Sequence, residues 1–473
     1  MKLPVAIVGA GPVGLAAAAH LWERGETPLV LEAGNSVGHS VLNWAHVRMF
    51  SPWRYNMDAA SKRLLVSTGW IEPDADHLPT GAEIVKHYLE PLAQRTPLAP
   101  HIKLNTRVIS ISRRGLDKVR SKGRESQPFS IRATSAEGEE TEFLAKAVID
   151  ASGTWRTPNP MGAIGEGCVR ERIDYGIPDV LGAKRADYAG SEIVVVGSGH
   201  SAFNVVLDLL TLKEDVPETL IRWVMRKQSL DKVFGGGAAD ALPARGALGQ
   251  RARDAVASGA VELITPFTIN QLSRTEHGQA LIKGELPTGP KSVTTDRIVV
   301  TTGFRPDLDI LREVRLEMDP ALESVRALGP LIDPNVHSCG SVRPHGAREL
   351  AHPEKDFYIV GMKSYGRAPT FLMATGYEQV RSVVAELTGD HEAAERVELD
   401  LPETGVCSLS DNENASEADA EPTCCGETSQ NKEQSCCGNS AEAITESGPA
   451  SDCTASCNST PVKPAKSPSA CCG

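Results

Sequence analysis

Cysteine is almost absent from most of this 473-residue chain. The first 401 residues contain two, Cys168 and Cys339, and the remaining nine of the 11 follow after them. No Cys-x-x-Cys pair occurs before residue 402, so this part lacks the redox-active thiol pair that disulfide exchange uses. Basic residues are also in deficit, with 49 Lys and Arg against 61 Asp and Glu and a net charge of -12. Because no basic surplus is available to neutralise phosphates, we expect no nucleic-acid partner.

Long apolar runs are missing as well. The apolar stretch at residues 5–19 is interrupted by glycines and Pro12, and it is shorter than a bilayer requires. The opening residues 1–4 lead directly into a predicted strand, without the charged region or cleavage site of a secretory signal. We therefore expect no membrane association and a cytoplasmic protein. Thiols stay reduced there, and cysteines serve as ligands or redox groups rather than structural disulfides.

The end of the chain differs in composition from the rest. Residues 402–473 carry 11 acidic and 3 basic residues, no aromatic residue, and four residues that are Val, Ile or Leu. Such a segment cannot bury enough apolar surface to offset the entropy lost on ordering. We predict a disordered, acidic, cysteine-rich tail over residues 396–473.

Two stretches alternate between strand and helix patterns, which predicts an α/β fold with two Rossmann-like domains. In the first stretch, strands at 5–8 and 28–32 flank a helix at 14–23. In the second, strands at 193–196 and 220–225 flank a helix at 201–210. The remaining predicted elements are strands at 102–112, 129–133, 146–151, 297–302 and 356–361 and helices at 80–94 and 369–387.

The first predicted helix opens with the glycine-rich turn Gly9-Ala10-Gly11-Pro12-Val13-Gly14. Gly9 permits the tight turn, Gly11 lets the backbone approach a pyrophosphate, and Gly14 lets the helix pack close to the strand. The helix N-terminus offers its N–H groups to the diphosphate. Glu32 follows Gly14 by 18 residues and ends the next strand, where its carboxylate accepts hydrogen bonds from ribose hydroxyls. This turn predicts an unphosphorylated adenosine ribose, as in FAD.

A second glycine turn, Gly197-Ser198-Gly199-His200-Ser201-Ala202, again stands between a strand and a helix. No acidic residue ends the following strand; Arg226 and Lys227 stand there, with Arg222 shortly before. Cations at that place suit the 2′-phosphate of NADPH, whereas surface cations without a ligand are the alternative. Two sites with opposite charge at the ribose predict FAD and NADPH, between which hydride passes if the domains stack the two rings.

With both turns in place, the chain resembles the two-dinucleotide-domain flavoproteins over residues 1 to about 390. This superfamily contains the thioredoxin reductases and the flavin-containing monooxygenases. Residues 149–154 resemble the first crossover out of the FAD domain, residues 300–307 the second, and residues 357–361 the strand that approaches the flavin ribityl chain. That strand usually ends in Gly-Asp in the family, whereas Met362 follows Gly361 here.

The resemblance implies four segments. They are an FAD-binding part at 1–165, an inserted NADPH-binding domain at 166–305, a second FAD-binding part at 306–395, and the tail at 396–473. The residues expected to bind cofactors are Gly9, Gly11, Pro12, Gly14, Glu32, Val108, Gly153, Gly197, Gly199, His200, Ser201, Arg226, Lys227, Gly303 and Gly361.

Residues 361–372, with His337-Ser338-Cys339-Gly340 upstream, are similar to a narrower group, the flavin monooxygenases encoded in bacterial arsenic-resistance operons. This resemblance implies oxidation of trivalent arsenic or antimony compounds with NADPH and oxygen. In the implied chemistry, reduced FAD and oxygen form a flavin hydroperoxide, and the metalloid lone pair attacks its distal oxygen. The F-x-G-x-x-x-H stretch of classical monooxygenases is absent in its standard form; the nearest match is Tyr188-Ala189-Gly190.

Four residues are candidates for the oxidative chemistry. Cys168 and Cys339 lie near the two crossovers, and we hypothesise that they form part of a thiophilic substrate site; two ordinary small residues are the alternative. Arg48 and Asn56 lie in the aromatic-rich stretch 44–56, where superfamily members cover the flavin. We expect them to contact the flavin ring or an oxygen intermediate.

The tail repeats the tripeptide Cys-Cys-Gly three times. Thiolates are soft ligands, and a trivalent arsenic or antimony centre takes three of them, so the repeats suggest metalloid capture. An all-cysteine zinc site, redox reactions among the thiols and a dispensable appendage remain open. The candidate ligands are Cys424, Cys425, Cys436, Cys437, Cys471 and Cys472.

The expected function is thus that of an FAD- and NADPH-dependent monooxygenase acting on a small trivalent metalloid and oxygen. One alternative is an NADPH-dependent flavin reductase of a thiol, a disulfide or a protein partner, with the tail cysteines as a swinging dithiol. Another is a metalloid-binding protein with a vestigial flavin site. A homodimer is left open.

Overall fold

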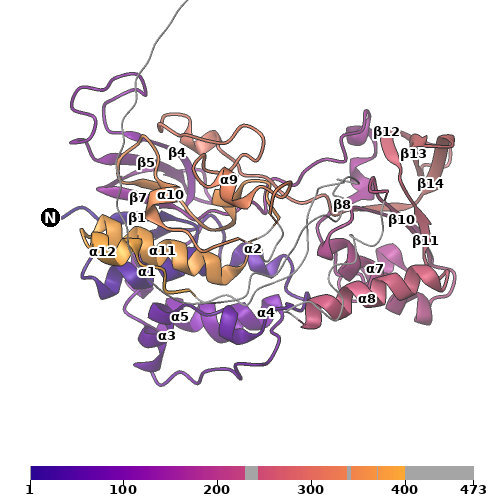
Figure 1. Ribbon diagram of the computed structural model, residues 1–473, viewed down its shortest axis with the longest axis horizontal. Helices are drawn as coiled ribbons and strands as arrows, with labels where there is room; N and C mark the ends of the chain where they lie inside the picture. The colour runs from indigo at the N-terminus through magenta and orange to yellow at the C-terminus, as the bar shows by residue number, and fades with distance from the viewer. Residues whose placement is uncertain (1, 229–242, 338–341, 370, 400–473) are drawn as a thin grey trace, which may run out of the picture. The chain divides into compact units, whose positions relative to one another are not determined.

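The computed structural model describes residues 2–228, 243–337, 342–369 and 371–399 (Figure 1). Cys339 and the six candidate tail ligands lie outside these ranges, as does almost all of the predicted tail. Among the described residues, no helix combines the length and the apolar character of a membrane span.

The first sheet has five parallel strands in the order β16-β7-β1-β2-β3. The central strands β1 (Val5–Val8) and β7 (Ala147–Asp150) are buried along their whole length, as expected for a parallel sheet that is covered on both faces. The other strands are β2 (Pro28–Leu31), β3 (Ile102–Lys103) and β16 (Phe357–Ile359). The sheet therefore joins segments from both ends of the described chain.

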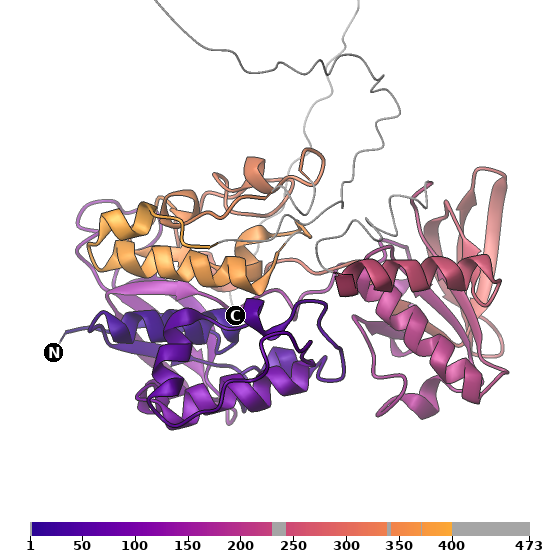
Figure 2. The ribbon, with the colours of Figure 1, turned by 60° about the horizontal axis from the view of Figure 1, so that its bottom comes forward.

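Helices α1 (Pro12–Glu23) and α11 (Met373–Leu387) pack side by side although they come from opposite ends of this domain (Figures 1 and 2). Helix α1 begins at Pro12, earlier than predicted, because proline suits the first helical position, where its missing N–H is not needed. Helices α3 (Ala59–Val66) and α12 (His391–Glu395) pack against α1 and α11, respectively.

The helix predicted at 80–94 forms as a run of three pieces. These are α4 (Gly81–Ile84), a π-helical turn η2 (Val85–Leu89) and α5 (Glu90–Arg95). Pro91, near the start of α5, has no N–H to donate to the preceding turn, and a wider turn accommodates that loss. A capping box formed by Thr80 and Glu83 begins the run.

The second parallel sheet has the order β11-β10-β9-β15-β8. Its strands are β8 (Ile173–Tyr175), β9 (Glu192–Val196), β10 (Leu220–Val224), β11 (Glu262–Ile264) and β15 (Arg297–Val300). Helices α7 (His200–Asp215) and α8 (Pro243–Ala257) pack together beside it (Figure 1). All five strands lie between β7 and β16 in the sequence. The predicted α/β class with two Rossmann-like sheets, one inserted in the other, is confirmed.

The described residues also form two antiparallel sheets of three strands each. One contains β4 (Arg107–Arg113), β5 (Phe129–Thr134) and β6 (Glu140–Ala145). The other contains β12 (Thr268–Arg274), β13 (Ala280–Leu286) and β14 (Gly289–Thr295), which were not predicted from the sequence. The short helices are α2 (His39–Leu42), α6 (Arg185–Tyr188), α9 (Gly329–Ile332), α10 (Ala347–Leu350), η1 (Trp53–Tyr55), η3 (Ala99–His101), η4 (Glu166–Arg172), η6 (Asp309–Leu311) and η7 (Gly361–Tyr365).

Candidate dinucleotide-binding sites

The first glycine turn connects β1 to α1. Gly9 has φ +99°, and a Cβ atom on it would lie 2.8 Å from the carbonyl oxygen of Ala151. A Cβ on Gly14 would lie 2.0 Å from the carbonyl oxygen of Gly9, so the helix packs against the strand only without a side chain there. Nothing lies within 4 Å of the corresponding position on Gly11, which has ordinary extended backbone. Gly9 and Gly14 are therefore required by the fold, whereas no protein contact requires glycine at position 11, which leaves open space there for a ligand.

The N-terminus of α1 fits a diphosphate. Gly11 is its N-cap, Pro12 is its first residue, and no side chain caps the helix. The N–H groups of the first turn have no partner within the helix, and together with the helix dipole they favour an anion.

Glu32 lies directly beside this turn. Its Oε2 accepts a hydrogen bond from the N–H of Ala10 and its Oε1 one from the N–H of Gly34, each at 2.7 Å. The carboxylate is thereby fixed while its remaining lone pairs stay available for ribose hydroxyls. Nearby, the hydroxyl of Ser36 is buried without a hydrogen-bond partner in the described structure, although sequence patterns did not select it. An orphaned buried hydroxyl beside the glycine turn fits a bound nucleotide.

Sequence patterns did not select Arg107, a cation that interacts with Glu32. Desolvation and the neighbouring Arg156 lower the pKa of Arg107, while Glu32 acts in the opposite direction. Arg107 begins β4, and the next residue is the predicted ligand Val108, which is buried and faces Ala133 on β5. Arg107 adds a charged side chain at this position, and the predicted contact of Val108 with the cofactor stays a prediction.

The predicted crossover glycines take left-handed backbone conformations. Gly153 has φ +69° with nothing within 4 Å of a Cβ position. Gly361 has φ +68° and lies against Val13 in the first turn of α1, with 3.4 Å between its Cβ position and Cγ2 of Val13. Its N–H donates to Oε1 of the buried Gln379. The late strand thus ends against the first turn of α1, next to the first glycine turn.

A buried ion pair at this point escaped sequence reasoning. Lys363 Nζ lies 2.7 Å from Asp150 Oδ2 and 3.0 Å from Ser152 Oγ. Side chains of both charged residues are at most 1% exposed. The available signal was an acidic residue inside the apolar run 147–151 and a lysine just after Gly361.

The second glycine turn connects β9 to α7. Gly197 has φ +133°, and its Cβ position would lie 2.3 Å from Thr301 Oγ1. Its carbonyl oxygen accepts a hydrogen bond from the indole N–H of Trp223 at 2.7 Å. Gly199, like Gly11 in the first turn, is the N-cap of a helix and has nothing within 4 Å. His200 and Ser201 form the first helical positions.

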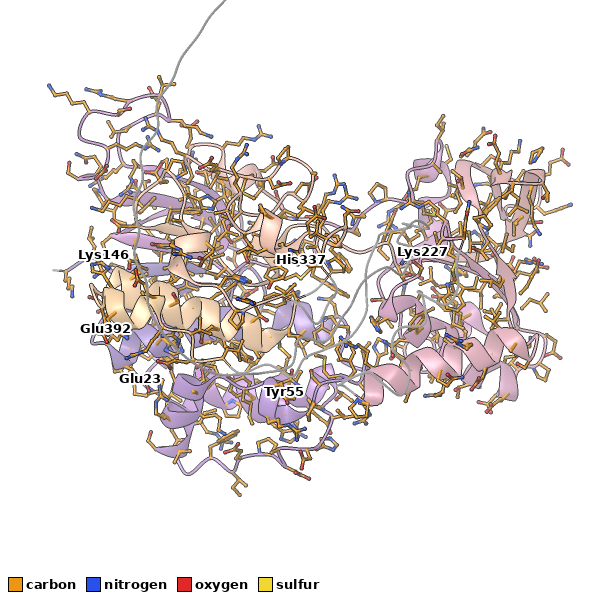
Figure 3. The ribbon with its side chains drawn as sticks, in the orientation of Figure 1. Glu23, Tyr55, Lys146, Lys227, His337 and Glu392 are labelled. Carbon is orange, nitrogen blue, oxygen red and sulfur yellow. The ribbon has the colours of Figure 1, made fainter. Side chains whose placement is uncertain are left out.

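The cations after β10 divide into two groups. Arg222 lies within the strand and pairs with Glu192 and Glu262 at 2.9 and 3.0 Å, so it is engaged inside the sheet. Arg226 and Lys227 follow the strand end (Figure 3 labels Lys227). Arg226 is exposed and Lys227 is half-buried. This pair, rather than Arg222, is placed for a ribose phosphate.

The two crossovers are joined by one residue. The side chain of Asn159 donates to the carbonyl oxygen of Thr302 at 3.1 Å and accepts from Nε of Arg305 at 3.0 Å. The backbone N–H of Asn159 donates to the carbonyl oxygen of Gly303. Gly303 is one of the predicted cofactor-binding residues and has φ +84°. The crossovers therefore form a hydrogen-bonded pair of segments.

The three predicted catalytic residues that the structure describes, Arg48, Asn56 and Cys168, are not in contact with one another; Cys339 lies outside the described residues. Asn56 is 1% exposed, and its side chain bonds only to Ser51 and Pro52 among the described residues. Arg48 is exposed and donates to the carbonyl oxygen of Leu78. Cys168 is an exposed free cysteine in η4. Their catalytic roles stay predictions. Within the described ranges no cluster of three or more His, Cys, Asp or Glu side chains could hold a metal ion.

A model of the pyridine nucleotide-disulphide oxidoreductase family matches residues 6–325. The chain belongs to this family. The matched range contains both glycine turns and both crossovers. Membership confirms the expectation of a flavin-dependent oxidoreductase that uses FAD and NADPH.

Known relatives include both reductases and monooxygenases. The chain is 27% identical over 207 residues to the indole-3-pyruvate monooxygenase YUCCA6 of Arabidopsis thaliana. That match covers 43% of this chain and 44% of the relative, less than half the length of either.

Several solved structures match over most of the chain, and two of them illustrate the range of reactions. A bacillithiol disulfide reductase from Bacillus cereus has 17% identity and a TM-score of 0.60, over 82% of this chain and 99% of its own. The FAD-bound cadaverine monooxygenase of desferrioxamine biosynthesis from Erwinia amylovora has 16% identity and the same TM-score, over 87% and 99%. At these identities the likeness establishes the fold and does not choose between the reactions.

Proposed function

We propose that the protein is a monooxygenase that reduces FAD with NADPH and uses dioxygen to oxidise a small substrate. The observation that carries this proposal is the lack of a thiol pair before residue 402. Cys168 and Cys339 stand 171 residues apart in the sequence, and Cys168 is a free thiol. Electrons on the flavin therefore have no thiol pair before residue 402 to accept them, and dioxygen, which diffuses in, is the acceptor in this proposal.

The chain's own residues hold the two cofactors. Gly11 and the first turn of α1 receive the FAD diphosphate, and Glu32 accepts the hydroxyls of its ribose. Arg226 and Lys227 bind the 2′-phosphate of NADPH beside Gly199 and α7. When bound, the flavin supplies the two-electron chemistry with nicotinamide and oxygen, and the protein supplies orientation and exclusion of water.

We further propose that the substrate is a trivalent arsenic or antimony compound. The similarity of residues 361–372 to monooxygenases of arsenic-resistance operons and the nine cysteines after residue 401 support this choice. The electrons balance. The metalloid lone pair and NADPH each give two electrons to dioxygen, one oxygen atom enters the product, and the other leaves as water with two protons.

Simultaneous measurement of three quantities tests the reaction. With arsenite as the substrate, NADPH oxidation, oxygen consumption and arsenate formation are expected in equal amounts. Hydrogen peroxide accounting for all of the oxygen, at a rate that arsenite does not change, would contradict both the substrate and the reaction. If the rates respond to another small nucleophile but not to arsenite, the proposed monooxygenase reaction is supported and the proposed metalloid substrate is wrong.

The second candidate is an NADPH-dependent reductase of disulfides, favoured by the three Cys-Cys-Gly repeats. The full-length chain with all nine tail cysteines replaced by serine separates the two functions. A monooxygenase retains its maximal oxygen-dependent rate and needs more arsenite to reach it, because the capture ligands are gone. A reductase with a tail dithiol loses its anaerobic, NADPH-dependent reduction of a model disulfide.

A further inference from the structure

The buried pair of Lys363 and Asp150 acts on a third residue, Ser152. Removing two charges from water costs about as much as their attraction returns, so such a pair adds little to the free energy of folding compared with apolar side chains. Its effect on Ser152 is specific. Ser152 Oγ donates to Asp150 Oδ1 at 2.6 Å and accepts from Lys363 Nζ at 3.0 Å.

These two bonds leave Ser152 with one kind of hydrogen bond still to make. A hydroxyl has one proton and two lone pairs. The carboxylate takes the proton, because it can only accept, and the ammonium takes one lone pair, because it can only donate. The backbone N–H of Ser152 also goes to Asp150 Oδ1, at 3.1 Å. One lone pair remains, so Ser152 is held as an acceptor.

Ser152 faces the nucleotide site from one side of β1. It is exposed, although Lys363 and Asp150 are buried. Its Cα lies 3.1 Å from the Cβ position of Gly9, which places it directly beside the glycine turn. No protein atom lies within 4 Å of the Cβ position on the next residue, Gly153.

The strand order places Ser152 opposite Glu32. β1 lies between β7 and β2, Ser152 follows β7, and Glu32 follows β2. If the adenosine ribose is at Glu32 and the diphosphate is at the N-terminus of α1, the part of FAD that reaches Ser152 lies beyond the diphosphate. That part is the ribityl chain, which carries hydroxyl groups. Met362, beside Gly361, has only a thioether sulfur, which is a weak acceptor compared with a carboxylate.

We propose that Ser152, held as an acceptor by Lys363 and Asp150, binds a hydroxyl group of the FAD ribityl chain. A diphosphate oxygen carries no proton at neutral pH and cannot donate to the remaining lone pair, whereas an alcohol can. Lys363 and Asp150 are positioning residues in this arrangement. The proposal depends on the FAD assignment alone, so the identity of the oxidised substrate does not affect it.

Binding of ribityl-modified cofactors to the full chain tests this contact. The dissociation constants of FAD and of its 2′-, 3′- and 4′-deoxyribityl analogues are measured by flavin fluorescence on protein freed of flavin. We expect one analogue to bind the unaltered protein about tenfold more weakly than FAD, the effect of one lost hydrogen bond. Ser152→Ala should remove this difference by weakening FAD and leaving that analogue unchanged. Ser126→Ala, at an exposed serine bonded within its own loop, is the control.

Variants of Lys363 test the positioning role. Lys363→Gln keeps an N–H donor for Ser152 and should retain the preference for FAD over the sensitive analogue. Lys363→Met removes the donor and should reduce that preference, while the affinity for the sensitive analogue changes less. Circular dichroism and the melting temperature report folding; if the Met variant does not fold, the Ser152 measurements still decide. The proposal is overturned if Ser152→Ala retains the full preference, or if the unaltered protein binds all three analogues as tightly as FAD.

Discussion

Arg113 Nε donates to Glu354 Oε1 over 2.8 Å, although 241 residues separate the two in the sequence. Arg124 donates to the same carboxylate at 2.7 Å, and all three side chains are at most 4% exposed. Burial acts to raise the pKa of Glu354, but hydrogen bonds from Arg124 and Arg113 outweigh it and lower the pKa. One carboxylate thus ties β4 and the following loop to the segment before β16.

Replacing Glu354 with glutamine should destabilise the folded state by about 3–5 kcal/mol, because it leaves two buried guanidinium groups without a countercharge. Urea unfolding at pH 7 measures the effect, and Glu137→Gln, at an exposed site, is the control. The lowered pKa makes this stabilisation fully present above pH 4.5 and lost as the pH falls further. The difference between the unaltered protein and the variant should therefore shrink in acid. A variant as stable as the unaltered protein at pH 7 would refute the role of this cluster.

Gly11→Val should abolish FAD binding without unfolding the protein. The backbone at Gly11 has φ -78°, which any residue adopts, and no protein atom lies within 4 Å of its Cβ position. A side chain there meets only the cofactor. Flavin absorbance of the purified protein and the melting temperature are the two measurements. Gly167→Val, at a glycine with equally open space, is the control and should keep its flavin. Retention of FAD by the Gly11 variant would remove this turn from the cofactor site.

The double variant Arg226→Ala/Lys227→Ala should raise the KM for NADPH about 100-fold and leave the KM for NADH within about twofold. Each charge-assisted hydrogen bond to the 2′-phosphate contributes about 1.5–3 kcal/mol, and NADH lacks that group. Steady-state NAD(P)H oxidation measures both constants. Lys283→Ala removes an exposed cation from β13 and serves as the control. An equal loss with both nucleotides would indicate a general electrostatic effect rather than recognition of the phosphate.

His352→Asn should change how stability depends on pH. Burial lowers the pKa of His352 from 6.5 to about 4, and its Nδ1 accepts a hydrogen bond from the N–H of Glu317. An unfolded chain takes up a proton below pH 6.5, whereas the folded protein does so only near pH 4. The contribution of His352 to the free energy of unfolding is therefore present above pH 6.5 and is lost between pH 6.5 and 4. The total loss is about 3 kcal/mol.

The measurement is urea unfolding of the unaltered protein and the Asn variant at several pH values. The unaltered protein should lose stability relative to the variant across this interval. His277→Asn, at an exposed histidine, is the control. Its free energy of unfolding should depend on pH in the same way as that of the unaltered protein. If the curve of stability against pH for His352→Asn also ran parallel to that of the unaltered protein, the half-buried imidazole of His352 would not contribute.

Local patterns predicted the parts of the site that are built locally. The glycine turns at Gly9 and Gly197 each depend on a strand, a turn and a helix within about 20 residues, and the structure forms all three. Glu32 was found in the same way. The two turns also carried the assignment of both cofactors.

Contacts between distant segments were not readable from the sequence. Lys363 and Asp150 are 213 residues apart, and each alone is an unremarkable charge next to an apolar strand. Strand β12 was missed because the burial of Thr268–Arg274 does not alternate regularly between buried and exposed residues. The side-chain hydrogen bonds of Asn56 close within its own loop, which no sequence pattern indicates, and its contact with the flavin stays a prediction.

The strand order of the first sheet also determines how long one strand must remain without its neighbour while the chain is being synthesised. β7 ends at residue 150 and its partner β16 begins at residue 357, and the whole second sheet is synthesised between them. At roughly 5–20 residues per second, β7 therefore waits about 10–40 s for its neighbour. During that interval its open edge can pair with a wrong strand. All five strands of the inserted domain's sheet, by contrast, are synthesised before β16, so this domain can fold first.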